Sequence, residues 1–164
     1  MTTQRIFRFI ISIAKTEGAG VIGAFFTTPA ITTWYVTLTK PAPNPPNWIF
    51  GPVWTILYFL MGVAVFMVWS LYADAPEGDV KKGRRNALII FDIQLALNVV
   101  WSIFFFGLHS PFLALIGIIV LWCAVVWTII LFYPISRVAA YLLVPYILWV
   151  SFAVYLNYAI FALN

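Results

Sequence analysis

The chain has 164 residues, of which 64% are hydrophobic and only 9% are charged. A soluble domain is about 45–50% apolar and about 25% charged, and a chain of this size leaves a large share of its surface in water. The composition therefore excludes a water-soluble globular domain and a disordered chain, and it predicts a protein of the lipid bilayer. The net charge of +4 rests on few groups, so we expect no nucleic-acid partner. A single cysteine, Cys123, excludes an intrachain disulfide and a cysteine-based metal site.

Five apolar stretches, separated by short polar breaks, predict five membrane-spanning helices, because one helix needs about 20 apolar residues to cross the hydrocarbon core. Their approximate bounds are 9–33, 48–72, 87–108, 112–132 and 138–162. The proline-rich break at 40–46 cannot be helical throughout. Ser110 followed by Pro111 is typical of a helix N-cap and first turn. We therefore predict one all-α membrane domain over residues 1–164, a five-transmembrane-helix bundle.

Two charged residues, Lys15 and Glu17, interrupt the first span. A secretory signal is one interpretation, but the apolar run before Lys15 is short for it. We expect instead a membrane helix in which Lys15 extends to the lipid headgroups and Glu17 faces other helices. The residues that follow are small at helical spacing, which favours close helix packing: Ala19, Gly20, Gly23 and Ala24.

Basic residues lie almost entirely on one side of this five-span arrangement. The N-terminal side and the second and fourth connections hold eight of the nine: Arg5, Arg8, Lys15, Lys81, Lys82, Arg84, Arg85 and Arg137. The positive-inside rule then predicts a cytoplasmic N-terminus and an exterior C-terminus, in a multi-pass protein of the cell membrane. No internal repeat is visible, so the sequence does not support a transporter built from two related halves.

The residues available for catalysis are few. The chain has one histidine, His109, and three of its five acidic residues fall in the 74–79 connection. No nucleotide-binding or metal-binding motif is present. We therefore predict no catalytic residue, no metal site and no required cofactor, and we expect His109 to be a polar connection residue.

Aromatic and polar residues share helix faces in three of the predicted spans. The three stripes are Trp54, Tyr58 and Met61; Gln94, Asn98, Trp101 and Phe105; and Trp149, Ala153 and Asn157. They could surround one aromatic cavity for a flat, mostly apolar ligand. Alternatively, the amides join helices and the tryptophans fill space. Asp92 lies on a different face from Asn98 and is either a proton or ion site or a helix-packing partner.

Three blocks carry a family resemblance. They read PPNWIFGPVWTILY at 45–58, QLALNVVWS at 94–102 with FFFG at 104–107, and PYILWVSFAVYLN at 145–157. In this order, and over nearly the whole chain, they resemble the TspO/MBR family, the tryptophan-rich sensory proteins related to the mitochondrial translocator protein, or peripheral benzodiazepine receptor.

The resemblance implies a five-helix bundle, commonly a homodimer, with a pocket beneath the first connection. It also implies porphyrin or other tetrapyrrole ligands and, in mitochondrial members, cholesterol and benzodiazepine-type drugs. The positions that match the family's pocket are Tyr35, Pro45, Trp54, Tyr58, Asn98, Trp101, Trp149 and Ala153. The sterol pattern of mitochondrial members needs a basic residue after the fifth-helix tyrosine, and this chain has none there.

The resemblance and the stripes together predict a membrane protein that binds a porphyrin, protoporphyrin or haem-like, and acts in its transport, sensing or turnover. The alternative from another class is an enzyme that degrades porphyrin in light, with Trp54, Trp101 or Trp149 as electron donor. A third interpretation is a structural partner protein, which predicts no saturable porphyrin binding. The residues expected at the site are the same for the first two, so the sequence leaves the choice open.

Overall fold

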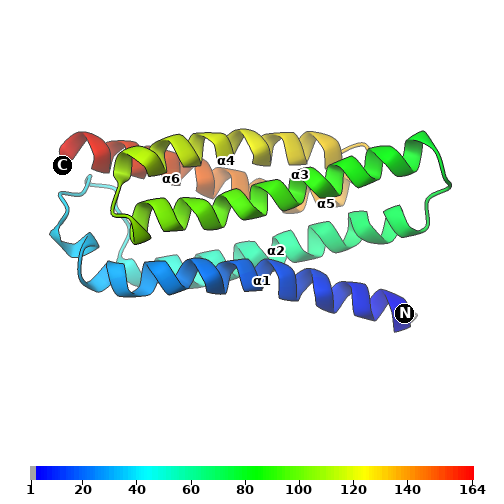
Figure 1. The fold of residues 1–164 in the computed structure, drawn as a ribbon, viewed down its shortest axis with the longest axis horizontal. Coiled ribbons are helices and arrows are strands. Elements are labelled where there is room, and N and C mark those ends of the chain that lie inside the picture. The colour runs from blue at the N-terminus through cyan, green and yellow to red at the C-terminus, as the bar shows by residue number, and fades with distance from the viewer. Residues whose placement is uncertain (1–2) are drawn as a thin grey trace.

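The computed structural model describes residues 3–164 as a bundle of long helices, with no strand among them. Figure 1 shows these helices side by side along the long axis of the molecule. The elements are α1 (Thr3–Thr32), η1 (Tyr35–Thr37), α2 (Asn47–Ala73), α3 (Asp79–Ser102), η2 (Ile103–Gly107), α4 (Pro111–Phe132), α5 (Arg137–Leu142) and α6 (Val144–Leu163). Within the described chain, five helical segments are long and apolar enough to cross a membrane. The predicted five-helix architecture is confirmed.

Two helices begin earlier than their apolar stretches. α1 begins at Thr3 and α3 at Asp79, where the sequence predicts starts near residues 9 and 87. The additional turns hold charged residues such as Arg8 and Arg85. Hydropathy locates only the part of a helix that lies in hydrocarbon, whereas the helix itself continues into the polar region.

The fifth span is two helices joined at Leu143. Pro145 stands in the first turn of α6, where its missing N–H removes no helical hydrogen bond but interrupts continuation from α5. At the start of α4, the Ser110 hydroxyl accepts a hydrogen bond from the Leu113 N–H at 3.4 Å, with Pro111 next in the chain. The N-cap predicted from the sequence is therefore confirmed.

The bundle has a closed order of neighbours. α1 packs against α2 and α3, α4 packs against α3 and α6, and α2 packs against α5. The α1–α2 seam is tight at Gly62, where a Cβ atom would lie 2.7 Å from the Ile13 and Thr16 side chains. The small residues of α1 also bring α3 close, since a Cβ at Gly23 would lie 3.2 Å from the Ser102 hydroxyl. The predicted packing role of this small face is confirmed at Gly23.

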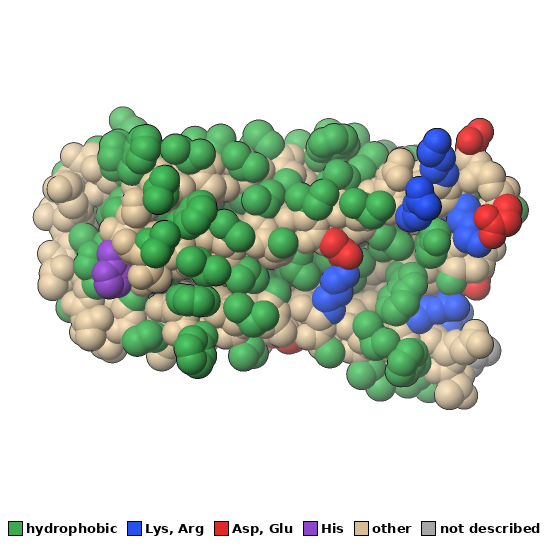
Figure 2. All heavy atoms as spheres, in the orientation of Figure 1, with side chains coloured by type: hydrophobic (Ala, Val, Ile, Leu, Met, Phe, Trp, Pro, Cys, Tyr) green, Lys and Arg blue, Asp and Glu red, His purple; other side chains and the backbone are tan. Residues whose placement is uncertain are grey.

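Charged side chains gather at one end of the bundle, with one further pair on the side, on a face that is largely hydrophobic (Figure 2). The Lys15 ammonium donates a hydrogen bond to the Asp92 carboxylate of α3. The sequence did not predict this pairing, in which the partly exposed Lys15 side chain meets a carboxylate of the neighbouring helix. For Asp92 the structure favours the helix-packing alternative.

Candidate ligand-binding cavity

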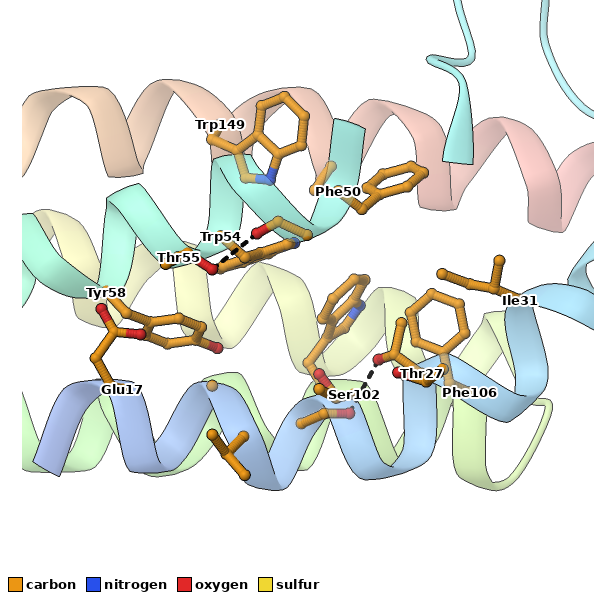
Figure 3. A pocket seen from close by; sticks show the side chains of 18 of the residues that line it. Glu17, Thr27, Ile31, Phe50, Trp54, Thr55, Tyr58, Ser102, Phe106 and Trp149 are labelled. Atoms are coloured by element: carbon orange, nitrogen blue, oxygen red, sulfur yellow. Dashed lines mark hydrogen bonds between the residues drawn. The ribbon is translucent and has the colours of Figure 1, made fainter. Parts of the chain in front are cut away.

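A cavity of about 270 Å³ lies in the half of the bundle that carries the first connection. Four helices and η2 enclose it, and Figure 3 shows their side chains converging on it. α1 contributes Glu17, Gly20, Val21, Gly23, Ala24, Thr27, Thr28 and Ile31; α2 contributes Phe50, Gly51, Trp54, Thr55 and Tyr58; the remainder are Trp101, Ser102, Phe106, Trp149, Phe152, Ala153 and Leu156.

Aromatic rings from three helices form the wall of the cavity. The Trp54 and Tyr58 rings stack at a centroid distance of 5.5 Å, and Trp54 lies 6.3 Å from Trp101. Across from them, Phe50 meets Trp149 at 6.2 Å in an edge arrangement. A concave, mostly apolar surface with a few polar groups is the usual character of a small-molecule site.

Buried amide side chains form hydrogen bonds with aromatic residues of this wall on the side away from the cavity. The Tyr58 hydroxyl donates to Asn98 Oδ1, and Asn98 Nδ2 donates to the Tyr146 hydroxyl at 3.1 Å. Trp101 Nε1 donates to Asn157 Oδ1 at 3.1 Å. Asn98 is 1% exposed and does not line the cavity. Its polar atoms orient aromatic side chains, so the alternative that amides join helices is correct for this residue.

The other two amide residues of the predicted stripes are Asn157 and Gln94. Asn157 Nδ2 donates to the Pro111 carbonyl at 2.8 Å, which ties α6 to the start of α4. Gln94 is 1% exposed, and neither atom of its amide has a hydrogen-bond partner within residues 3–164. Met61 is fully buried in the core and does not reach the cavity.

The first connection lies one layer outside the cavity. Tyr35 packs against Phe50 at 6.4 Å and Phe106 at 6.0 Å, and these two rings line the cavity in its place. The Tyr35 hydroxyl donates to Asn44 Oδ1 at 2.7 Å, and burial raises the pKa of this hydroxyl, so it remains a donor. Pro45 is half-buried and its carbonyl accepts from Asn44 Nδ2 at 3.1 Å.

Two contacts fix the same connection to the end of the bundle. The Trp34 indole stacks on the His109 imidazole at 4.6 Å, so His109 is a stacking partner as well as a connection residue. The Thr39 N–H donates to Asn164 Oδ1 at 2.9 Å, and Asn164 Nδ2 donates to the Thr39 carbonyl at 3.0 Å. The connection therefore closes this end of the bundle over Phe105 and Phe106.

Five of the eight residues predicted for the site line the cavity: Trp54, Tyr58, Trp101, Trp149 and Ala153. Of the other three, Tyr35 and Asn98 contact lining residues from outside the cavity, and Pro45 lies in the first connection. The sequence prediction missed the α1 wall, although Gly20, Thr27 and Ile31 fall on one helix face. The sequence analysis interpreted Gly20 as helix packing alone and made no prediction for Thr27 or Ile31.

The cavity opens on the side of the bundle between α1 and α2. Its exposed lining residues come from these two helices: Val21, Ala24, Thr28, Gly51 and Thr55. We call this set the side opening. Glu17 is the only lining residue of the described chain that has an acidic or basic side chain. Residues 3–164 bring together no group of three His, Cys, Asp or Glu side chains that could hold a metal ion.

These features define an all-helical membrane protein with a tryptophan-walled cavity between its helices. Comparison with known proteins specifies the class further: the chain belongs to the TspO/MBR family, whose model matches residues 12–163. It is 43% identical over 161 residues to the tryptophan-rich protein TspO of Archaeoglobus fulgidus, an alignment that covers 98% of this chain and 99% of the relative.

More distant relatives match over most of the chain. The translocator protein of Homo sapiens is 37% identical over 131 residues, which cover 80% of this chain and 75% of the relative. The tryptophan-rich sensory protein of Cereibacter sphaeroides is 37% identical over 131 residues, which cover 80% of this chain and 77% of the relative. The chain is thus a membrane protein of this family.

Proposed function

We propose that this protein binds a porphyrin-like ligand in the aromatic cavity and acts in its transport, sensing or turnover. The observation that carries the proposal is the convergence of Trp54, Tyr58, Trp101 and Trp149 on one cavity. Flat π-systems stack on such rings. Because the lining is apolar, a hydrophobic ligand can pass from lipid into the cavity without breaking hydrogen bonds.

We infer the manner of binding from the size of the cavity. At about 270 Å³ the cavity is slightly smaller than the usual range of small-molecule pockets, about 300–1,000 Å³. A whole macrocycle would therefore extend through the side opening, with one edge among the tryptophans and the other between α1 and α2. Entry and exit would take place from the bilayer.

The relatives' names are consistent with this proposal, since two of them are a translocator protein and a sensory protein. We further propose a location in the cell membrane with the N-terminus in the cytoplasm. Its support is the basic residues of the N-terminal side and of the first turns of α3, Arg84 and Arg85 among them. A homodimeric state is proposed on the family resemblance.

Titration with protoporphyrin IX tests the proposal. The protein is reconstituted in nanodiscs, and tryptophan fluorescence and the porphyrin absorption band are followed together. We expect saturable binding, weakened in Trp54→Leu and unchanged in Trp127→Leu, because Trp127 on α4 is 56% exposed and lies outside the cavity. Absence of saturation, or equal losses in the two variants, would exclude this site.

Light-dependent degradation of the bound porphyrin is the second candidate. Its specific support is the pair of neighbouring indoles Trp54 and Trp101, with centroids 6.3 Å apart, which both line the cavity and are oxidisable electron donors for an excited ligand. Illumination with dioxygen present separates the two candidates. Binding alone leaves the shifted spectrum intact, whereas degradation bleaches it and yields a product that requires both protein and light.

A further inference from the structure

We propose that Glu17 makes the cavity selective for the charge of its ligand, so that it prefers a flat aromatic molecule carrying an ammonium group. This inference rests on the proposed function of the same cavity and names the ligand class more narrowly. The ammonium would bind at Glu17, and the aromatic body would lie along Trp54 and Trp149.

Glu17 lies at one end of the aromatic wall of the cavity. Its carboxylate lies beside the Tyr58 ring in Figure 3. The ring can come this close to α1 because the next turn of that helix carries Gly20. Glu17 lies nine residues after Arg8, which is about 14 Å along a helix. That distance is about half of a hydrocarbon core ~30 Å thick.

No side chain of the described structure neutralises this carboxylate. Within residues 3–164 Glu17 takes part in no hydrogen bond and no ion pair, although carboxylates at such depth are normally paired. Lys15 is two residues away, about 200° around the helix, and donates to Asp92. The Tyr58 hydroxyl donates to Asn98 instead.

An ammonium group would satisfy the carboxylate and the aromatic wall together. A cation within about 6 Å of a tryptophan or tyrosine ring centroid is attracted by the ring face. Glu17 and the half-buried Trp54 line the same cavity, so one ligand can meet a carboxylate and an indole face. The Tyr58 ring lies between them, packed against Gly20 and stacked by Trp54. An aromatic amine would thereby form an ion pair with Glu17, while its apolar body stays away from the carboxylate.

Anionic groups have no matching partner in the cavity. None of its described lining residues is Lys, Arg or His. The carboxylates of a protoporphyrin would therefore have to stay at the side opening, away from Glu17. The same carboxylate that favours a cationic ligand disfavours the entry of a dianionic one with its charged edge first.

Three probes with the same macrocycle test the inference: protoporphyrin IX, its neutral dimethyl ester, and a diamide with two dimethylaminoethyl groups that are cationic at pH 7. Affinities are measured by tryptophan quenching in nanodiscs of uncharged lipid. We expect wild type to bind the cationic probe more tightly than the neutral one. Glu17→Gln should weaken binding of the cationic probe roughly tenfold or more. It should leave the affinity for the neutral probe unchanged, and it should leave unchanged or raise the affinity for protoporphyrin.

Opposite responses to probes of opposite charge are expected only from an electrostatic role, because a damaged cavity would weaken all three. The matched control is Glu77→Gln, which removes an exposed carboxylate from the connection between α2 and α3 and should change nothing. If Glu17→Gln fails to fold, the order of the three affinities in wild type decides. Equal affinities for the cationic and neutral probes overturn the inference and leave the proposed function intact; no saturable binding of any probe overturns the proposed function.

Discussion

Gly20 of α1 lies directly against the ring of Tyr58 of α2, so that a Cβ atom at position 20 would stand 2.6 Å from two ring carbons. The ring cannot easily yield, because its hydroxyl donates to the buried Asn98. This contact sets both the separation of the two helices and the position of Tyr58 in the cavity.

Gly20→Ala should therefore destabilise the protein and disturb the cavity. Overpacking of this kind costs about 1–3 kcal/mol, and the displaced ring would reduce the room for a ligand. Thermal unfolding in detergent and porphyrin titration measure the two effects. The control is Gly18→Ala, where the added Cβ would have no other part of the described chain within 4 Å. Equal behaviour of the two variants would contradict the role of this contact.

Asn98 should contribute to stability through the two tyrosines that it joins. Asn98→Ala leaves the Tyr58 and Tyr146 hydroxyls without their partner in a buried region, which we expect to lower the free energy of unfolding by about 1–3 kcal/mol. The loss should be smaller in a Tyr58→Phe background, where one stranded hydroxyl is already gone. A loss of the same size in both backgrounds would show that the hydrogen bond with Tyr58 is not part of its cause.

The small side chain of Ala153 should leave room for the ligand on the α6 side of the cavity. Ala153→Leu adds three carbons to the cavity lining, and an overpacking cost of about 1–3 kcal/mol corresponds to porphyrin binding weakened roughly five- to 150-fold. The fold should survive, because the added atoms enter a void. Ala162→Leu, at an exposed position of the same helix, is the control and should bind normally. Normal binding by Ala153→Leu would remove α6 from the site.

The orientation of the bundle should follow its basic residues. A reporter fused after Asn164 and expressed in a bacterial inner membrane should indicate an exterior C-terminus, because the N-terminal side and the first turns of α3 hold most of the positive charge. Moving the Lys81 and Lys82 charges into the first connection should weaken this orientation. A cytoplasmic C-terminus in the unmodified chain would overturn the orientation.

The five-span architecture was predictable because a bilayer demands long apolar helices, and that demand appears directly in the sequence. The cavity faces of α2 and α6 were predictable for a related reason. Residues four apart share a helix face, so Trp54 with Tyr58, and Trp149 with Ala153, point the same way wherever their helices pack. The helix ends at Thr3 and Asp79 were not predictable from hydropathy, which is silent outside hydrocarbon.

Only the tertiary structure decided which neighbour each face meets. Asn98 carries no local sign that its partners are Tyr58, 40 residues before it, and Tyr146, 48 residues after it. Likewise Lys15 and Glu17, two residues apart, have opposite surroundings: one meets Asp92 and the other the cavity. Periodicity fixes directions around one helix axis, whereas the rotation of each helix is set by how all five pack together. The sequence therefore determined the aromatic faces, and packing decided that one unpaired carboxylate would lie among them.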